Sequence, residues 1–172
     1  MKLSTFALAA TLVAPAATAA AQGVTDPQIA SIVVTANQVD IDAGKIAVAQ
    51  AASPEVKKFG QQMVDQHTGV NKQAVALVTK LKVTPQDNPT SQSLKAGGET
   101  NTRNLKTLKG AAFDRAYVDH EVAYHQAVLD AIDTTLIPNA KNAELKELLT
   151  KTRPAIAAHL EHAKSLRASL TN

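Results

Sequence analysis

The sequence predicts an all-α fold made of two helical hairpins. Apolar residues recur at steps of three and four along four long stretches, which is typical of helices that bury one face. Only the Ser53-Pro54 turn separates the first two stretches, whereas residues 83–110 separate the second stretch from the third. Because short loops place consecutive helices antiparallel, this spacing predicts two antiparallel hairpins joined by one long connection.

In the first hairpin, we expect helices at about residues 27–52 and 53–82. Asp26-Pro27 provides a capping side chain and a proline suited to the first helical turn, and Ser53-Pro54 repeats this arrangement for the second helix. Each helix is expected to turn one face to the core. These faces comprise Ile29, Ile32, Val33, Ala36, Val39, Ala43 and Ile46 in the first helix, and Val56, Gly60, Met63, Val64, His67, Val70, Ala74, Leu77, Val78 and Leu81 in the second.

In the second hairpin, we expect helices at about residues 111–135 and 142–170. Asn142 is placed to cap the last helix. Pro154 lies inside that helix and is expected to kink it, because proline removes one backbone donor and clashes with the preceding turn. The inward faces comprise Phe113, Tyr117, Tyr124, Val128, Ala131 and Ile132 in one helix, and Leu145, Leu148, Thr152, Ile156, His159, Ala163, Leu166 and Leu170 in the other.

The connection at residues 83–110 breaks the helical pattern at Pro85, Pro89 and Gly97-Gly98. It is long for a structureless loop in a compact domain, so we expect it to carry a short extra helix. Two hairpins joined by one long crossover have the connectivity of ferritin-like four-helix bundles. The sequence therefore predicts a ferritin-like four-helix bundle.

Residues 1–21 have the order of regions found in a secretory signal peptide. Lys2 precedes the apolar run Leu3–Val13, and a stretch of small residues then leads to a cleavage point before Gln22. Residues 22–172 are expected to form one domain, since one core can serve a chain of this length. No later segment is apolar enough to span a membrane. We therefore expect a periplasmic or secreted protein.

The composition excludes several classes of function. The chain has no cysteine, which excludes disulfides, thiolate metal sites and thiol chemistry. Its formal net charge is only +3, its lysines are scattered, and it has three Phe, two Tyr and no Trp, which argues against a nucleic-acid partner. It has neither a phosphate-binding loop nor a Gly-x-Ser-x-Gly elbow. The partner class that stays open is an unidentified protein of the cell envelope.

A set of motifs is distributed over nearly the whole predicted mature chain. They are Ser53-Pro54-Glu55-Val56-Lys57-Lys58-Phe59, Met63-Val64-Asp65-Gln66-His67, Phe113-Asp114-Arg115-Ala116-Tyr117, His125-Gln126-Ala127-Val128, and His159-Leu160 followed by Ala163. In these motifs the chain resembles domain-of-unknown-function family 4142, exported bacterial proteins of the ferritin-like superfamily. The resemblance implies a fold and export without implying an activity. Members of that family usually carry an apolar residue where Glu121 stands.

The placement of histidines points to a candidate site. His67 and His159 lie where the helical period expects a core hydrophobe. Asp40 and His67 lie at similar distances from the Ser53 turn, and Glu121 and His159 are about level in the second hairpin, given the rise of about 1.5 Å per residue. Four helices are therefore expected to offer polar groups at mid-bundle. The period directs His67, Glu121 and His159 to the core and places Asp40, His120, His125 and His162 nearer its margins.

The set of side chains does not fit a di-iron oxidase or peroxidase. Ferritin-like di-iron sites use a Glu-x-x-His motif on two of the helices, but Met63-Val64 stands where the second helix would need that glutamate. The candidate ligands are instead rich in nitrogen, which suits one transition-metal ion such as zinc, copper or iron. We expect no catalytic residue. The candidate metal ligands are His67 and His159, assisted by Glu121, His125 or Asp40.

Alternative interpretations stay open for the same residues. His67 and His159 can be neutral core histidines, each hydrogen-bonded to a carbonyl, a tyrosine hydroxyl or a carboxylate. The protein would then be a metal-free structural or interaction module of the cell envelope. Glu121 can be a ligand together with His125, an internal ion-pair partner of His125, or a residue turned to the edge of the bundle. Metal analysis of the mature protein distinguishes the two functions.

Overall fold

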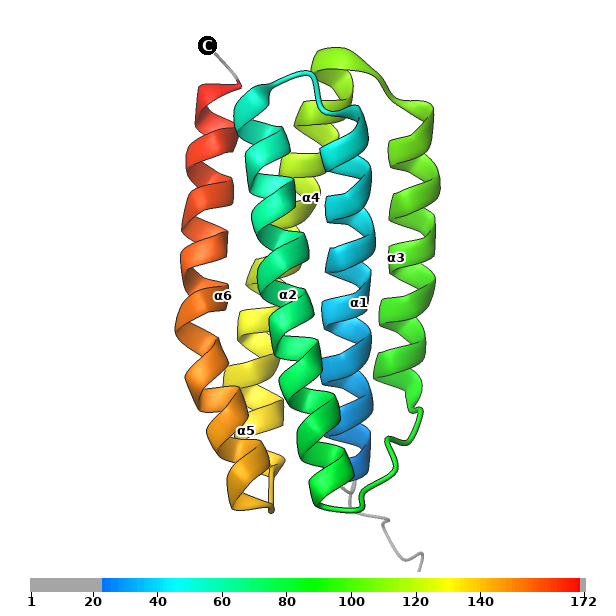
Figure 1. Cartoon of the computed structure of the whole chain (residues 1–172), viewed down its shortest axis with the longest axis vertical. Coiled ribbons are helices and arrows are strands. Elements are labelled where there is room, and N and C mark those ends of the chain that lie inside the picture. Colours follow the sequence, from blue (N-terminus) through cyan, green and yellow to red (C-terminus); the bar gives the residue numbers. More distant parts are fainter. Residues whose placement is uncertain (1–22, 171–172) are drawn as a thin grey trace, which may run out of the picture.

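The computed structural model describes residues 23–170, and every regular element in that range is helical. The predicted signal peptide at residues 1–21 lies outside the described residues. Figure 1 shows an elongated bundle in which the long helices lie side by side. These helices are α1 (Asp26–Gln50), α2 (Pro54–Lys80), α3 (Pro89–Thr107), α4 (Gly110–Ala131) and α6 (Ala143–Ser169).

The long helices α1 and α2 run antiparallel to each other, and so do α4 and α6. In Figure 1, α1 rises and α2 descends after the short turn at residues 51–53, and α4 descends before α6 rises beside it. The crossover helix α3 returns the chain to the upper end of the bundle and packs along the outer side of α1. Within residues 23–170, no helix has both the length and the hydropathy needed to cross a membrane.

The turn between α1 and α2 is fixed by hydrogen bonds to a side chain of the other hairpin. Ser53 caps α2, and its hydroxyl accepts a hydrogen bond from the Val56 amide at 3.3 Å. The buried carboxylate of Asp114, on α4, accepts hydrogen bonds from the backbone amides of Ala52 and Ser53 at 3.0 and 2.8 Å. These two bonds fix the height of α4 relative to the first hairpin, and hence the level at which their polar side chains meet.

The opposite end of the bundle has a similar connection, and here the predicted cap is wrong. Thr25 is the N-cap of α1, and Asp26 lies in the first turn. The Asp26 carboxylate instead accepts hydrogen bonds from the amides of Lys141 and Asn142, each at 2.9 Å. Local spacing could not separate the two roles, because Asp26 satisfies donors at the start of α6 that are distant in sequence.

The crossover is a full-length helix and not a short one. Asn88 caps α3 by accepting from the amides of Thr90 and Ser91, each at 3.1 Å, and Pro89 occupies its first turn. Gly97-Gly98 lies inside the helix, although the sequence pattern predicted a break in the helix there. A Cβ on Gly98 would lie 2.7 Å from a Val39 methyl carbon, so the glycine is needed where α3 passes close to α1.

The end of the third predicted helix also differs. The α-helix α4 ends at Ala131, and the chain continues through a π-helical turn, Ile132–Leu136, and the short helix α5, Ile137–Asn139. Such turns occur mostly as local irregularities within α-helices. The final helix begins as predicted, since Asn142 accepts from the amides of Glu144 and Leu145, and α6 continues through Pro154 as one helix.

The interior is divided into two apolar clusters. The upper core, near the α1–α2 turn, contains the buried aromatic residues Phe59, Phe113 and Tyr117 together with Met63 and Leu105. The lower core, near the start of α1, is built from aliphatic side chains, with Ile29 and Leu149 among them. Six buried polar residues lie together between the two cores, namely Asn37, Asp40, His67, Glu121, His125 and His159. The fold therefore contains one polar layer at mid-height, where the sequence predicts a site.

Candidate metal centre

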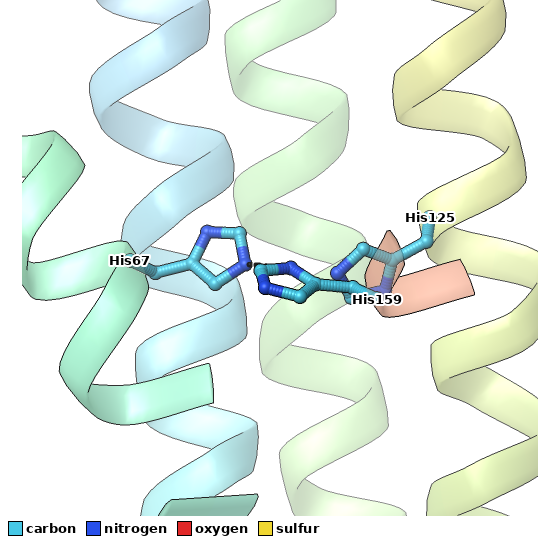
Figure 2. A group of neighbouring side chains, drawn as sticks. All are labelled: His67, His125 and His159. Carbon is cyan, nitrogen blue, oxygen red and sulfur yellow. Dashed lines mark hydrogen bonds between the residues drawn. The ribbon is translucent and has the colours of Figure 1, made fainter. Parts of the chain in front are cut away.

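Three buried histidines from three helices meet in this polar layer. His67 comes from α2, His125 from α4 and His159 from α6, and Figure 2 shows their rings turned toward one another. The ring centroids are 5.1 to 5.7 Å apart. One nitrogen of each ring lies within 4.8 Å of a nitrogen of both others. Imidazoles from both hairpins thus lie close enough to share one ion.

The hydrogen bonds around His67 determine which of its nitrogens carries the proton. Its Nδ1 lies 2.7 Å from Oδ1 of Asn37. The amide nitrogen of Asn37 donates to the carbonyl of Val33 at 2.8 Å, so the amide oxygen faces the ring and accepts from Nδ1. In the neutral ring Nε2 then carries a lone pair, and this atom faces the other histidines.

His125 and His159 are anchored in a similar manner. His125 Nδ1 lies 3.0 Å from the backbone carbonyl oxygen of Glu121, one turn earlier on α4. His159 Nε2 lies 2.5 Å from Oε1 of Gln66 on α2. Because these oxygens only accept, His125 Nε2 and His159 Nδ1 are left with lone pairs. All three rings therefore direct N–H groups outward and lone pairs inward, which is the orientation of metal-ligating histidines.

Two acidic side chains complete the polar layer. Asp40, on α1, is 1% exposed, and its Oδ2 lies 2.9 Å from His67 Nε2 and 3.3 Å from His125 Nε2. Glu121, on α4, is 0% exposed, and its Oε2 lies 3.4 Å from His125 Nδ1. Asp40, Glu121 and His125 offer ligand atoms within 4.8 Å of one another. The five residues predicted as candidate ligands thus lie in one cluster.

The helical period misplaced two members of this cluster. Asp40 and His125 were expected nearer the margins of the core, yet each is 1% exposed. The reason is that α1 packs against α2, α3 and α4, and α4 packs against α1, α3 and α6, so both helices are covered over a wider arc than one apolar stripe. The margin positions of the other two histidines agree with prediction. His120 is half-buried and stacks on Tyr124, and His162 is exposed.

The surroundings shift the pKa values of Asp40 and Glu121 in opposite directions. Burial acts to raise the pKa of Asp40, but the contact with His67 and the nearby His125 and His159 lower it below its ordinary value. Burial and the neighbouring Asp40 raise the pKa of Glu121 well above its ordinary value. Asp40 is therefore the anion of the pair, and Glu121 is the acid that keeps its proton to higher pH.

The same burial keeps two of the rings neutral. Desolvation is the largest cause that lowers the pKa of His125, and it lowers the pKa of His159 to about 3 with the help of the neighbouring histidines. A neutral imidazole is the form that binds a metal ion. Near neutral pH these two rings consequently need to lose no proton before they can act as ligands.

Several buried polar atoms of the cluster have no hydrogen-bond partner in the described part of the chain. They are both carboxyl oxygens of Asp40 and of Glu121, Nε2 of His125 and the hydroxyl of Tyr117. His67 Nε2 lies 2.9 Å from Asp40 Oδ2, and the two form an ion pair when that ring is protonated. A proton on Glu121 can satisfy at most one oxygen of each acid. Since buried polar groups are generally paired, the layer has the character of a binding site.

Sequence reasoning missed the two amides that orient the rings. Asn37 lies three residues before Asp40 and therefore on the same face of α1, so helical spacing could have found it. Gln66 adjoins His67 in the chain but contacts His159 across the α2–α6 seam. No spacing within one helix indicates that second contact, because it depends on the relative height of two helices.

Comparison with known proteins identifies the family. The sequence model described as Domain of unknown function (DUF4142) matches residues 10–166, so the chain belongs to this family. Among curated proteins, no sequence matches the chain. The match to the family model confirms the family resemblance that the motifs predict.

The fold is similar to that of a solved structure described as "CopM in the Cu(II)-bound form". The two structures superpose with a TM-score of 0.66, and the comparison covers 86% of this chain and 99% of that chain at 16% sequence identity. At this level of identity the similarity concerns the fold. It supports the all-helical architecture and leaves the function to be argued from the site.

Proposed function

We propose that this member of the DUF4142 family binds one transition-metal ion at mid-bundle, through His67, His125, His159 and Asp40. The observation that carries the proposal is the contact of 3.3 Å between His67 Nε2 and His159 Nδ1. The outer nitrogen of each ring faces an amide oxygen, so in the neutral rings both inner nitrogens carry lone pairs. Two lone pairs at this distance repel each other, and a cation shared by both nitrogens, a proton or a metal ion, removes the repulsion.

Asp40 supplies the negative charge that such an ion needs. It is the ionised acid of the layer and faces both His67 and His125. Glu121 supports Asp40 without being a ligand itself, because a protonated Glu121 carboxyl can donate a hydrogen bond to the Asp40 carboxylate. This arrangement gives three nitrogen ligands, one carboxylate ligand and one acid that orients the carboxylate.

The ligand set selects a class of metal. Imidazole and carboxylate ligands suit zinc, copper and iron, whereas calcium and magnesium prefer oxygen alone. Among divalent ions of the first transition row, copper(II) has the highest affinity for a given nitrogen and oxygen site. The structurally similar solved protein is described in a Cu(II)-bound form. We therefore expect copper(II) to bind most tightly and zinc to bind less tightly.

The metal-free structural module is the weaker interpretation. It requires each buried histidine to be satisfied within the protein. His67, His125 and His159 each have one bond to an oxygen, and His67 and His159 also lie within hydrogen-bond distance of each other. However, those bonds leave the second nitrogen of each ring at the centre of the cluster, together with an ionised aspartate. A scaffold would be served as well by apolar side chains at this level, since buried charges are costly to desolvate.

We also propose that the chain is a ferritin-like bundle and that it is exported. Two antiparallel helix pairs joined by the crossover α3 support a ferritin-like bundle, although this chain carries a nitrogen-rich site in place of a carboxylate-rich one. Residues 1–21 support export, so the metal would be bound in the periplasm or outside the cell.

Metal analysis of the purified mature chain tests the function. The protein is stripped with a chelator, incubated separately with copper(II), zinc(II) and iron(II), desalted and analysed for bound metal. We expect close to one copper ion per chain, and a lower retained fraction for zinc. Retention of none of the three ions after desalting would contradict the proposal and favour the metal-free module.

A further inference from the structure

A cavity of about 250 Å³ lies directly below the polar layer, within the lower core. Its walls come from α1, α2, α3, α4, the π-helical turn and α6, and apart from the inner end they are almost entirely apolar. Ile32, Val33, Val128, Ile132, Leu149 and Ile156 line it. The exposed residues Thr90 and Ala127 also belong to its lining, so the cavity reaches the surface beside α3 and α4.

The two cores differ in how completely they are filled. In the upper core, Phe59, Met63, Phe113 and Tyr117 are each 0% exposed and occupy the space between the helices. The lower core contains neither Phe59 nor Phe113, and its aliphatic side chains leave the cavity. Protein interiors usually hold few voids larger than a water molecule. A cavity of this size next to a polar cluster therefore calls for a functional explanation.

The inner end of the cavity is polar. Asn37, Asp40, His67 and His125 line it, whereas Glu121 and His159 do not. Of these four lining residues, Asp40 and His125 have side-chain atoms without a hydrogen-bond partner among residues 23–170. The face formed by Asp40, His67 and His125 is thus turned to the cavity, and a bound ion would be approached from this side.

We propose that the cavity binds a small organic molecule with an apolar body and one nitrogen or oxygen donor, and that the donor coordinates the metal ion from the side of Asp40, His67 and His125. This inference rests on the proposed function. Pockets for small ligands generally combine apolar walls with a few polar groups at one end. The addition of one donor to a four-ligand set gives five-coordination, which metal ions of this kind accept.

The dimensions define the ligand class. An apolar cavity of about 150 Å³ is large enough to hold benzene. A cavity of about 250 Å³ can accommodate a molecule with one further small ring, such as a phenyl group joined to an imidazole. The apolar walls exclude a sugar or a nucleotide, because these would bury many hydroxyl groups or charges without partners.

Titration with 4-phenylimidazole tests the inference, and imidazole serves as the matched probe without the apolar body. The copper(II)-loaded protein is titrated with each compound, and binding is followed by calorimetry and by the electron paramagnetic resonance spectrum of the copper. We expect a change in the copper spectrum and an affinity for 4-phenylimidazole about tenfold or more above that for imidazole, since only the former buries a ring. Copper content measured afterwards shows that the ion has stayed bound.

Variants of the wall provide the structural control. Ala131→Phe fills the cavity at a lining position six residues beyond His125, whereas Ala123→Phe places the same ring on the exposed side of α4. We expect the first variant to keep its copper but lose the preference for 4-phenylimidazole, and the second to behave as the parent. If Ala131→Phe does not fold, Ala36→Leu provides a smaller substitution in the same lining.

The possible outcomes separate this inference from the proposed function. If copper binds but 4-phenylimidazole binds no better than imidazole, or leaves the copper spectrum unchanged, the cavity inference is wrong and the metal site stands. If Ala131→Phe keeps the full preference, the ligand lies elsewhere and the inference is likewise overturned. If no metal binds at all, the metal analysis overturns the proposed function and this inference with it.

Discussion

His67 Nε2 and His159 Nδ1 face each other across the α2–α6 seam at 3.3 Å, although each ring already makes a hydrogen bond on its other side. Asn37 holds one ring and Gln66 holds the other. The two rings come from different hairpins, so their approach depends on the packing of the whole bundle. This pair is therefore the part of the site most sensitive to loss of a single side chain.

Replacement of His159 by alanine is expected to weaken copper binding strongly. The change removes one of three nitrogen ligands, and even loss of a supporting residue typically costs about 10- to 100-fold in metal affinity, so we expect a loss of about 100-fold or more. His162→Ala on the same helix is the matched control, because His162 is exposed and should leave affinity unchanged. Competition with a chelator of known affinity measures both variants. Equal affinity in His159→Ala and the parent would remove His159 from the ligand set.

Gln66→Ala tests whether the outer hydrogen bond of His159 orients the ring. Without the acceptor at 2.5 Å, the proton is free to move to Nδ1 and the lone pair then points outward. We expect copper affinity to fall about 10- to 100-fold, while the unfolding free energy changes by less than about 1 kcal/mol because Gln66 is exposed. Gln61→Ala on the same helix, which removes only a bond to Asp65, should change neither quantity. A similar affinity loss in both variants would indicate a general effect on α2.

The two acids are expected to respond differently to amide substitution. Asp40→Asn removes the anion that faces His67 and His125, so copper affinity should fall about 100-fold or more. Glu121→Gln replaces an acid that keeps its proton with an amide of similar shape, which can still donate to Asp40, so affinity should fall by less than about tenfold. Both constants are measured by the same chelator competition. A larger loss in Glu121→Gln than in Asp40→Asn would make Glu121 the ligand.

Much of this architecture could be predicted from the sequence, and the errors have a common cause. Helical periodicity and the Ser53 and Asn142 caps are local signals, and they predicted the four long helices and the level of His67. The role of Asp26, the length of α3 and the burial of Asp40 depend on contacts between distant segments. A single helix's period carries no information about how many neighbours will cover it.

The candidate site was predictable in its residue types and not in its geometry. Histidine at a core phase is unusual enough to mark His67 and His159, but a neutral structural histidine produces the same pattern. The direction of the lone pairs decides between the two, and this depends on Asn37 and Gln66. The cavity below the site was also invisible, because it results from the distribution of aromatic residues between the two cores.

Stability of the metal-free protein should fall as the pH falls below about 6.5. The folded-state pKa of His159 is about 3, against 6.5 for the free side chain, and the pKa of His125 is also lowered. Between these values the unfolded chain binds protons that the folded chain does not, so acid favours unfolding, by at most about 1.4 kcal/mol per pH unit for each histidine. The lowered pKa of the half-buried His120 adds to this trend, and the raised pKa of Glu121 opposes it above 4.5, so the net slope is smaller than the sum of the histidine contributions.

Urea unfolding at pH 7.0 and pH 5.0, with a chelator present, measures this dependence. The parent is expected to be less stable at the lower pH, and His159→Gln should show a smaller difference because one titrating group is gone. His162→Ala should keep the parent's dependence, since that ring is exposed. An identical difference in His159→Gln and the parent would show that His159 is not the buried neutral ring that sets the slope.

The neighbouring glycines of α3 should respond in opposite directions to alanine. A Cβ at Gly98 would lie 2.7 and 2.8 Å from the two methyl carbons of Val39, a stiff side chain, so Gly98→Ala should destabilise the protein by about 1–3 kcal/mol. At Gly97 a Cβ meets nothing within 4 Å, so Gly97→Ala should stabilise it by up to about 1 kcal/mol through helix propensity. Urea unfolding of the metal-free protein compares them. Because Val39 precedes Asp40, Gly98→Ala should also weaken copper binding, whereas equal stability of the two variants would show that α3 does not pack tightly on α1 in solution.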